Sequence, residues 1–406
     1  MDDATVAASS HSSTTAGDRH GGRKLLVIAH NYSNFTKGQI DAIADRFEEV
    51  VVLVRYNRFT DLSGILEFDT LKKYGRDFKI ADSSPENVEV VPLALTYAPI
   101  DRWYRSLGKH HYWAVKTELR GRIESFDLVH AHFSWTAGYV ATRLGEEFGI
   151  PSVITVHENE DRLADELQSG NDDLYWTWKN ADAIIRVNEK DCERLSEYND
   201  TVHAIPNGYD RERLPLKETA TARERLGISR DETVVFSLGG LIPRKRFDLL
   251  IEAVAAVEHD EPVVCAIGGR GKERRNLERL AQRYSNETLD VRVLGFIPNE
   301  ELANWLNACD IFALASESEG NPTVMFEALG CGKPYVGTNV GGVDEIITTD
   351  EYGLLCPPND TDALTEVLQR GLSRSWNRET ILEYGTRFTW NEIADEVYDV
   401  YQDVVE

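Results

Sequence analysis

The stretch of sequence that decides the fold reads Ser316-Glu317-Ser318-Glu319-Gly320-Asn321-Pro322-Thr323-Val324-Met325-Phe326-Glu327-Ala328-Leu329-Gly330. It follows Ile311–Ala315, a short apolar run typical of a buried strand. Asn321 is a good N-cap and Pro322 a good first helical residue, so a helix is predicted from there to the glycines. A helix that starts directly after a strand offers free N–H groups to an anion.

Two carboxylates of this stretch are candidates for ligand contact. Glu327 lies inside the apolar helix, where a carboxylate without partners is costly, so we expect it to accept hydrogen bonds, for example from ribose hydroxyls. Glu319 lies just before the helix and reaches the same region. A surface loop followed by an ordinary helix salt bridge explains this stretch, taken alone, equally well.

Outward from this stretch, short apolar runs alternate with amphipathic segments in two successive series. This pattern predicts an α/β protein of two Rossmann-like domains with a central cleft between them, where the carboxyl ends of both sheets meet. The predicted strands are Leu25–Ala29, Val50–Val54, Val88–Val91, Leu128–Ala131, Ser152–Val156 and Ala183–Val187, then Val234–Leu238, Val263–Ile267, Val291–Leu294, Ile311–Ala315 and Pro334–Val336.

The domain boundaries follow from composition and turns. Residues 1–22 are rich in Ser, Thr, Ala and Gly and are predicted to be a disordered tail. The turn cluster Ile205-Pro206-Asn207-Gly208 separates an N-terminal Rossmann-like domain, residues 23–206, from a second Rossmann-like domain, residues 207–385. Residues 386–406 are predicted to be a C-terminal helix that packs back on a domain, with apolar residues at 393, 397, 400 and 404.

A second candidate site follows the strand Val234–Leu238. Gly239 and Gly240 let the backbone approach a ligand, and Arg244-Lys245-Arg246 concentrates positive charge in an acidic protein. A diphosphate is the anion that such a cluster suits. The alternative is a solvated helix start.

A third candidate lies in Asp127-Leu128-Val129-His130-Ala131-His132. Strand alternation places His130 and His132 on the same side, with His132 nearer the carboxyl edge. A histidine at a strand end is more often a structural group than a catalyst, but its position at the cleft favours function.

Together these stretches resemble the retaining glycosyltransferases of family four (glycosyl transferases group 1), which are built on the GT-B fold. Glu319 and Glu327 match the family's E-x7-E signature, and the resemblance covers nearly everything after Arg23. It implies His132 and Glu319 as catalytic residues near the transferred sugar, and Gly38 on the acceptor side. It implies a donor site formed by Gly239, Gly240, Arg244, Lys245, Phe296, Ile297, Asn321, Pro322, Thr323 and Glu327.

The resemblance also implies the reaction. We expect a sugar to move from a nucleotide diphosphate sugar to a glycan or lipid-linked acceptor, with retention of configuration and without metal or cofactor. Gly240 stands where the family often has an arginine, and Arg244 is the candidate replacement. The triplet Asp360-Thr361-Asp362 looks like a helix cap rather than a metal motif. A nucleotide-sugar 2-epimerase of the same fold and a non-catalytic sugar-nucleotide-binding protein remain alternatives.

Charge and composition limit the possible partners of the protein and the environment in which it works. The chain has 406 residues, a net charge of −25 and basic residues that are mostly Arg, which argues against nucleic acid and favours a halophilic cytoplasm over a merely acidic one. Neither a membrane-spanning run nor a signal peptide is apparent. The five cysteines show no zinc-binding spacing and are expected to be reduced.

One N-terminal stretch, Arg102–Arg122, is basic and aromatic against this acidic background. Such helices lie well on anionic membrane surfaces, so we expect a peripheral contact with the inner face of the cell membrane, beside a lipid-linked acceptor. That placement fits the synthesis of a cell-surface polysaccharide. An ordinary helix whose aromatic residues are core explains the stretch equally well.

Overall fold

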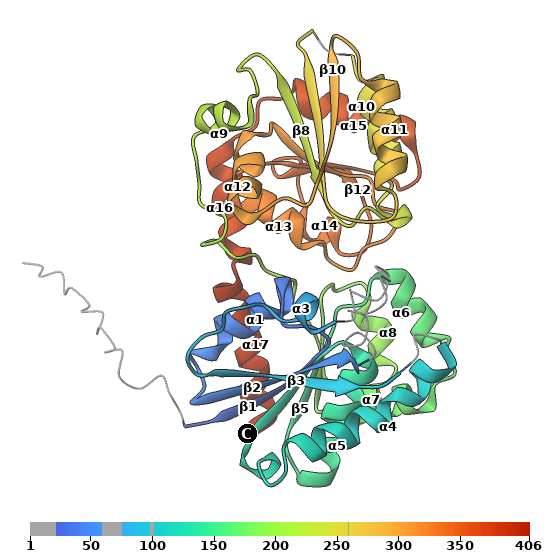
Figure 1. The fold of residues 1–406 in the computed structure, drawn as a ribbon, viewed down its shortest axis with the longest axis vertical. Helices are drawn as coiled ribbons and strands as arrows, with labels where there is room; N and C mark the ends of the chain where they lie inside the picture. The colour runs from blue at the N-terminus through green and yellow to red at the C-terminus, as the bar shows by residue number, and fades with distance from the viewer. Residues whose placement is uncertain (1–21, 59–74, 98–100, 259) are drawn as a thin grey trace, which may run out of the picture.

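The computed structural model describes residues 22–58, 75–97, 101–258 and 260–406, so the predicted tail at residues 1–22 lies almost entirely outside the described residues. Within these ranges the chain forms two lobes, each built on a parallel sheet (Figure 1). Each sheet has a separate apolar core on each of its faces, as in a doubly wound α/β fold. The predicted two-domain GT-B architecture is therefore confirmed.

The N-terminal sheet has the strand order β3-β2-β1-β4-β5-β6-β7. All its pairings are parallel, so every strand's carboxyl end lies at one edge. The strands are β1 Lys24–Ala29, β2 Glu49–Asn57, β3 Val88–Leu95, β4 Leu128–His132, β5 Ser152–Val156, β6 Ala183–Arg186 and β7 Val202–Ala204. The helices around it include α1 Asn34–Ala44, α4 Asp101–Glu118, α5 Tyr139–Phe148, α6 Glu160–Leu167 and α7 Asp172–Asn180.

The C-terminal sheet has the order β10-β9-β8-β11-β12-β13 and is also parallel. Its strands are β8 Thr233–Leu238, β9 Val263–Gly268, β10 Leu289–Gly295, β11 Ile311–Leu314, β12 Tyr335–Thr338 and β13 Gly353–Cys356. The helices include α9 Thr219–Leu226, α10 Phe247–Ala256, α11 Arg274–Tyr284, α12 Asn299–Ala308, α13 Thr323–Gly330, α14 Val343–Ile346, α15 Thr361–Ser373 and α16 Arg378–Gly385.

The last helix, α17 (Trp390–Val405), returns to the N-terminal lobe, where it lies beside the first strands (Figure 1). Ile393, Val397 and Val400 are buried in the same core as β1 and α1, as their helical spacing predicts. The chain therefore crosses between the lobes twice. The two crossings are tied together by backbone hydrogen bonds between Tyr209 and the segment 388–390.

Trp390 is wedged where these crossings meet the N-terminal lobe. A Cβ built on Gly38 of α1 would lie 2.1 Å from the Trp390 indole nitrogen, and one built on Gly208 would lie 2.8 Å from its ring. Both glycines therefore allow a close approach that no other residue permits. Gly38, expected on the acceptor side, does line the cleft described below, but its small size is required by packing against Trp390.

Replacing Gly38 with alanine is expected to destabilise the protein by about 1–3 kcal/mol, because the added methyl group overlaps the indole. Chemical unfolding followed by tryptophan fluorescence measures the change. Gly240→Ala is the matched control, because a Cβ there meets nothing within 4 Å. Equal stability of the two variants would contradict the wedge.

Candidate active site

A cavity of about 1620 Å³ lies between the two lobes. Its walls carry residues that follow β1, β4 and β5 on one side and β8 and β11 on the other, together with the linker after β7. Most of the predicted site residues line it: Gly38, Gly239, Gly240, Arg244, Lys245, Glu319, Asn321, Pro322, Thr323 and Glu327. His132, Phe296 and Ile297 do not.

The strongest electrostatic feature of the cavity is an ion triad around Glu319. The Lys245 Nζ lies 2.5 Å from one carboxylate oxygen and the Arg244 Nη1 lies 3.0 Å from the other. Glu319 and Lys245 are each more than nine-tenths buried. Burial alone would raise the pKa of Glu319, but the charges of Lys245 and Arg244 outweigh it and lower the pKa. Glu319 is therefore ionised at neutral pH and occupies both cations.

The third basic residue of this segment is separate from the triad. Arg246 adopts a left-handed conformation (φ 45°), which turns it towards Asp248 and Asn359 instead of the cavity. The Arg244-Lys245-Arg246 cluster predicted from the sequence thus contributes only its first two cations to the cleft.

Helix α13 begins at Thr323, so its bounds match the prediction, but the predicted cap does not form. Pro322 occupies the N-cap position, and the Asn321 side chain instead accepts a hydrogen bond from the Asn207 backbone N–H at 3.4 Å. The Asn207 side chain in turn donates to the Asn321 carbonyl at 2.9 Å. Asn321 therefore ties the start of α13 to the interdomain linker, and the helix N–H groups are left towards the cavity.

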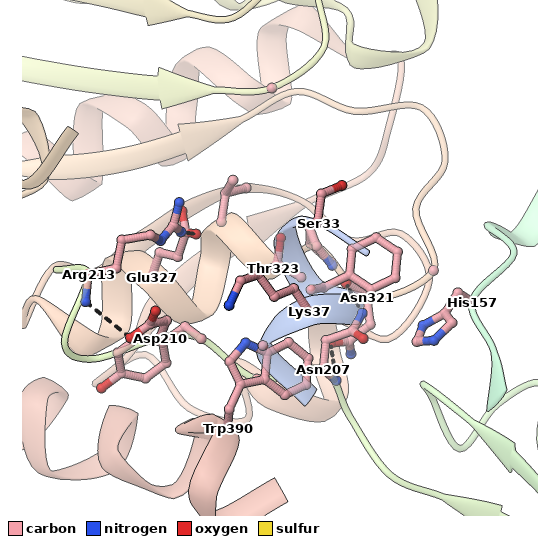
Figure 2. Close-up of a pocket in the computed structure, with 18 of the residues that line it drawn as sticks. Ser33, Lys37, His157, Asn207, Asp210, Arg213, Asn321, Thr323, Glu327 and Trp390 are labelled. Atoms are coloured by element: carbon pink, nitrogen blue, oxygen red, sulfur yellow. Dashed lines mark hydrogen bonds and ion pairs between the residues drawn. The ribbon is translucent and has the colours of Figure 1, made fainter. Parts of the chain in front are cut away.

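Glu327 projects from α13 near the linker residue Arg213 (Figure 2). Arg213 forms an ion pair with one oxygen of this buried carboxylate. The other oxygen has no hydrogen-bond partner among the described residues. Burial raises the pKa of Glu327 despite the opposing charge of Arg213. A ligand hydroxyl would satisfy the free oxygen, as the sequence predicts.

His132 does not line the cavity. Among the described residues, the histidines that do are His30, which follows β1, and His157, which directly follows β5 (Figure 2). His132 is completely buried behind His157, with its Nδ1 2.9 Å from the His157 Nε2 and the two rings stacked. Burial lowers the pKa of His132 to about 3, so it is neutral. The prediction that His130 and His132 lie on the same side of the strand is correct, since their rings are neighbours. The chain that leaves β5, however, covers His132.

Phe296 and Ile297 lie outside the cavity. The Phe296 ring is 59% exposed and carries the Arg270 guanidinium 4.1 Å from its centre. Ile297 is buried and packs closely on Gly268. The structure therefore does not bring these two predicted donor-site residues into the cavity wall.

The loop that carries Glu319 also joins the two lobes. The Asn159 side chain donates to the Ser318 hydroxyl at 3.0 Å, and that of Asn188 donates to the Gly320 carbonyl at 3.2 Å. Further along, Glu345 accepts the backbone N–H groups of Glu189 and Lys190 at 2.7 and 3.0 Å. The backbone of the loop that carries Glu319 is therefore held by both lobes.

Comparison with known proteins places this geometry in a family. A model described as "Glycosyltransferase Family 4" matches residues 78–213, and one described as "Glycosyl transferases group 1" matches residues 218–388. The chain belongs to the group 1 glycosyltransferases. A D-inositol 3-phosphate glycosyltransferase of Saccharomonospora viridis is 28% identical over 72% of this chain and 73% of its own. The putative teichuronic acid biosynthesis glycosyltransferase TuaC of Bacillus subtilis is 29% identical over 71% and 69%.

Solved structures show that the glycosyltransferase shares its fold with other enzymes of this kind. Sucrose-phosphate synthase from Thermosynechococcus elongatus superposes with a TM-score of 0.74 at 22% identity, covering 94% of this chain and 98% of that one. Anabaena HepE in complex with UDP-glucose superposes with a TM-score of 0.66 at 18% identity, covering 94% and 99%.

Several residues of this glycosyltransferase's cavity are not predicted from the sequence. His157 and Glu158 directly follow β5, and the rule that ligands bind at the carboxyl edge of a parallel sheet points to them. Arg213 and Trp390 do not directly follow a strand in the sequence, because they belong to the two crossings between the lobes. No local sequence pattern identifies them as cavity residues. In the described part of the chain no helix is both long and apolar enough to cross a bilayer.

Proposed function

We propose that this glycosyltransferase moves a sugar from a nucleotide diphosphate sugar, such as UDP-glucose, to a hydroxyl of a glycan or lipid-linked acceptor. The observation that carries the proposal is the pair of cations, Arg244 and Lys245, held in the cleft by the carboxylate of Glu319. HepE, which has the same fold, is solved in complex with UDP-glucose, and this supports the donor class.

The diphosphate is proposed to bind at Lys245 and Arg244, next to the N–H groups that begin α13. These groups stabilise the negative charge that develops on the phosphates as the bond to the anomeric carbon breaks. The acceptor oxygen then forms the new bond to that carbon, and its proton leaves with the departing phosphate. The free oxygen of Glu327 is proposed to accept ribose hydroxyls, and Asn321, Pro322 and Thr323 to contact the sugar.

The catalytic histidine is assigned differently from the sequence-based expectation. We propose that His157 contacts the transferred sugar and that His132 acts as a positioning residue, because the hydrogen bond and stacking between them fix the ring of His157. Glu319 keeps its proposed place near the forming bond. Retention of configuration is proposed from the family, whose models match this chain in both lobes.

Metal independence is also part of the proposal. Lys245 and Arg244 supply the charge that a metal ion provides in other transferases. Asp360 caps α15, accepting the Ala363 N–H at 2.9 Å, which is the structural role predicted for this triplet. The family membership favours transfer over the 2-epimerase and non-catalytic alternatives.

Lys245→Met is expected to weaken UDP binding at least tenfold, because it removes a charge-assisted contact to the diphosphate. Isothermal titration at high salt measures the dissociation constant. Arg246→Met is the matched control, since it removes one positive charge from the same segment at a residue that does not line the cavity. The affinity of this variant for UDP should stay within twofold of wild type. Equal weakening by both variants would contradict the assignment.

Transfer activity is expected to persist after exhaustive treatment with EDTA, because the cations of the protein itself stabilise the leaving group. The measurement is release of UDP from UDP-glucose in the presence and absence of chelator. Full loss of activity in EDTA, restored by manganese, would contradict this part of the proposal.

We further propose a peripheral membrane contact through α4. Trp113 is 62% exposed on this helix, on the same face as the exposed Lys109 and His110. Leu107, Tyr112 and Val115 form the opposite, buried face, so only part of the aromatic content is core. The side chains at 101–105, which include part of the predicted basic stretch, lie outside the described ones.

Trp113→Ser is expected to reduce sedimentation with phosphatidylglycerol vesicles severalfold, because it removes the exposed indole that favours the interface. Leu216→Ser, which removes an exposed apolar side chain from the other lobe, is the control and should sediment like wild type. If wild type does not sediment at all at high salt, the contact is refuted.

A further inference from the structure

Two buried carboxylates in the wall of the cleft have no part in the donor site. Glu158 follows β5, directly after His157, and Glu166 lies on α6, so both belong to the N-terminal lobe. Each residue is at least nine-tenths buried. Burial raises the pKa of Glu166 well above its usual range, and the nearby charge of Glu158 raises it further. Both residues line the same cavity.

Each carboxylate has one oxygen that is paired and one that is not. Glu158 accepts the Ser134 backbone N–H at 3.0 Å through one oxygen, and Glu166 lies 3.3 Å from the Arg162 Nε through one oxygen. The second oxygen of each has no hydrogen-bond partner in the described part of the chain. An unsatisfied buried polar atom is costly, and one on each of two carboxyl groups in the same cleft wall indicates a ligand that forms hydrogen bonds with them.

The nearby described cations do not bind the two unpartnered oxygens of Glu158 and Glu166. Arg186 is fully buried, but its guanidinium is held by Asp191 and by the backbone carbonyls of Val156 and Glu158. Arg162, an exposed residue, is the cation that forms an ion pair with Glu166 among the described residues, and it does so through the other oxygen.

The pair is also adjacent to the loop of Glu319. A Cβ built on Gly320 would lie 3.1 Å from the Glu158 carbonyl oxygen, and Asn159 donates to Ser318. The backbone at Glu158 thus packs against the loop of Glu319, the residue proposed to lie near the forming bond.

We propose that Glu158 and Glu166 form an acceptor subsite that binds the ring hydroxyls of an uncharged sugar. The proposal rests on the proposed function, whose acceptor it specifies. Sugar hydroxyls both donate and accept hydrogen bonds, so they can pair with each carboxyl group whether it is ionised or protonated, whereas a phosphate is repelled by whichever carboxylate is ionised. The subsite therefore selects a neutral glycoside at this position, in contrast to an acceptor that presents its phosphate.

The test uses Glu158→Gln and Glu166→Gln in the full chain, with Asp165→Asn as the matched control. Each glutamine keeps the shape of the side chain and an acceptor oxygen, so folding is preserved, and thermal unfolding checks this. Asp165 is a neighbouring acid on the same helix, next to Glu166. The readouts are UDP binding, UDP release from UDP-glucose without acceptor, and transfer to the octyl glycosides of glucose, galactose and mannose or to their 6-phosphates.

Transfer to at least one neutral glycoside is expected, with poorer transfer to its phosphate. Both glutamine variants should raise the KM for that glycoside at least tenfold, while UDP binding and acceptor-free UDP release stay within twofold of wild type. Preference for the phosphates, no transfer to any neutral glycoside, or variants that behave like Asp165→Asn would overturn the subsite. Loss of UDP binding and release in wild type itself would instead refute the proposed function, and the subsite with it.

Discussion

The structure of the cleft depends on one interaction, the ion triad in which Glu319 is held by Lys245 and Arg244. A buried carboxylate and a buried ammonium are each costly alone, so each is retained only because the other is present. The triad joins the loop after β8 to the loop after β11 and so fixes this wall of the cavity. We propose that an incoming diphosphate displaces the Glu319 carboxylate from these two cations.

The surrounding fold places this triad in the cavity, opposite the N-terminal lobe. Parallel pairing puts the carboxyl ends of both sheets at the cavity, and the chain crosses between the lobes twice. Tyr209 and Trp390 join the two crossings by backbone hydrogen bonds, and the wedge of Trp390 against Gly38 holds the second crossing on the N-terminal lobe. Contacts of Ser318 and Gly320 with the N-terminal lobe place the proposed donor and acceptor sides next to each other.

Much of this arrangement could be predicted from local patterns. The helices α13 and α17 are predicted to within a few residues because their apolar spacing and flanking turns specify them locally, although α17 begins at Trp390 and not at residue 386. The strands β7 and β13 are not predicted, since three or four residues carry too little pattern and depend on their neighbours in the sheet. The burial of His132 behind His157 depends on the path of the chain after β5, and the turn of Arg246 depends on one left-handed residue. These features are set by tertiary contacts, which local sequence does not encode.

The proposed donor site requires a diphosphate to replace the Glu319 carboxylate at Lys245 and Arg244. The affinity of the Glu319→Gln variant for UDP tests this replacement most directly. Neutralising Glu319 keeps its shape but frees both cations from a competing charge. Isothermal titration should therefore show UDP binding severalfold more tightly to Glu319→Gln than to wild type, with the difference reduced at high salt. Equal or weaker binding by the variant would contradict the replacement.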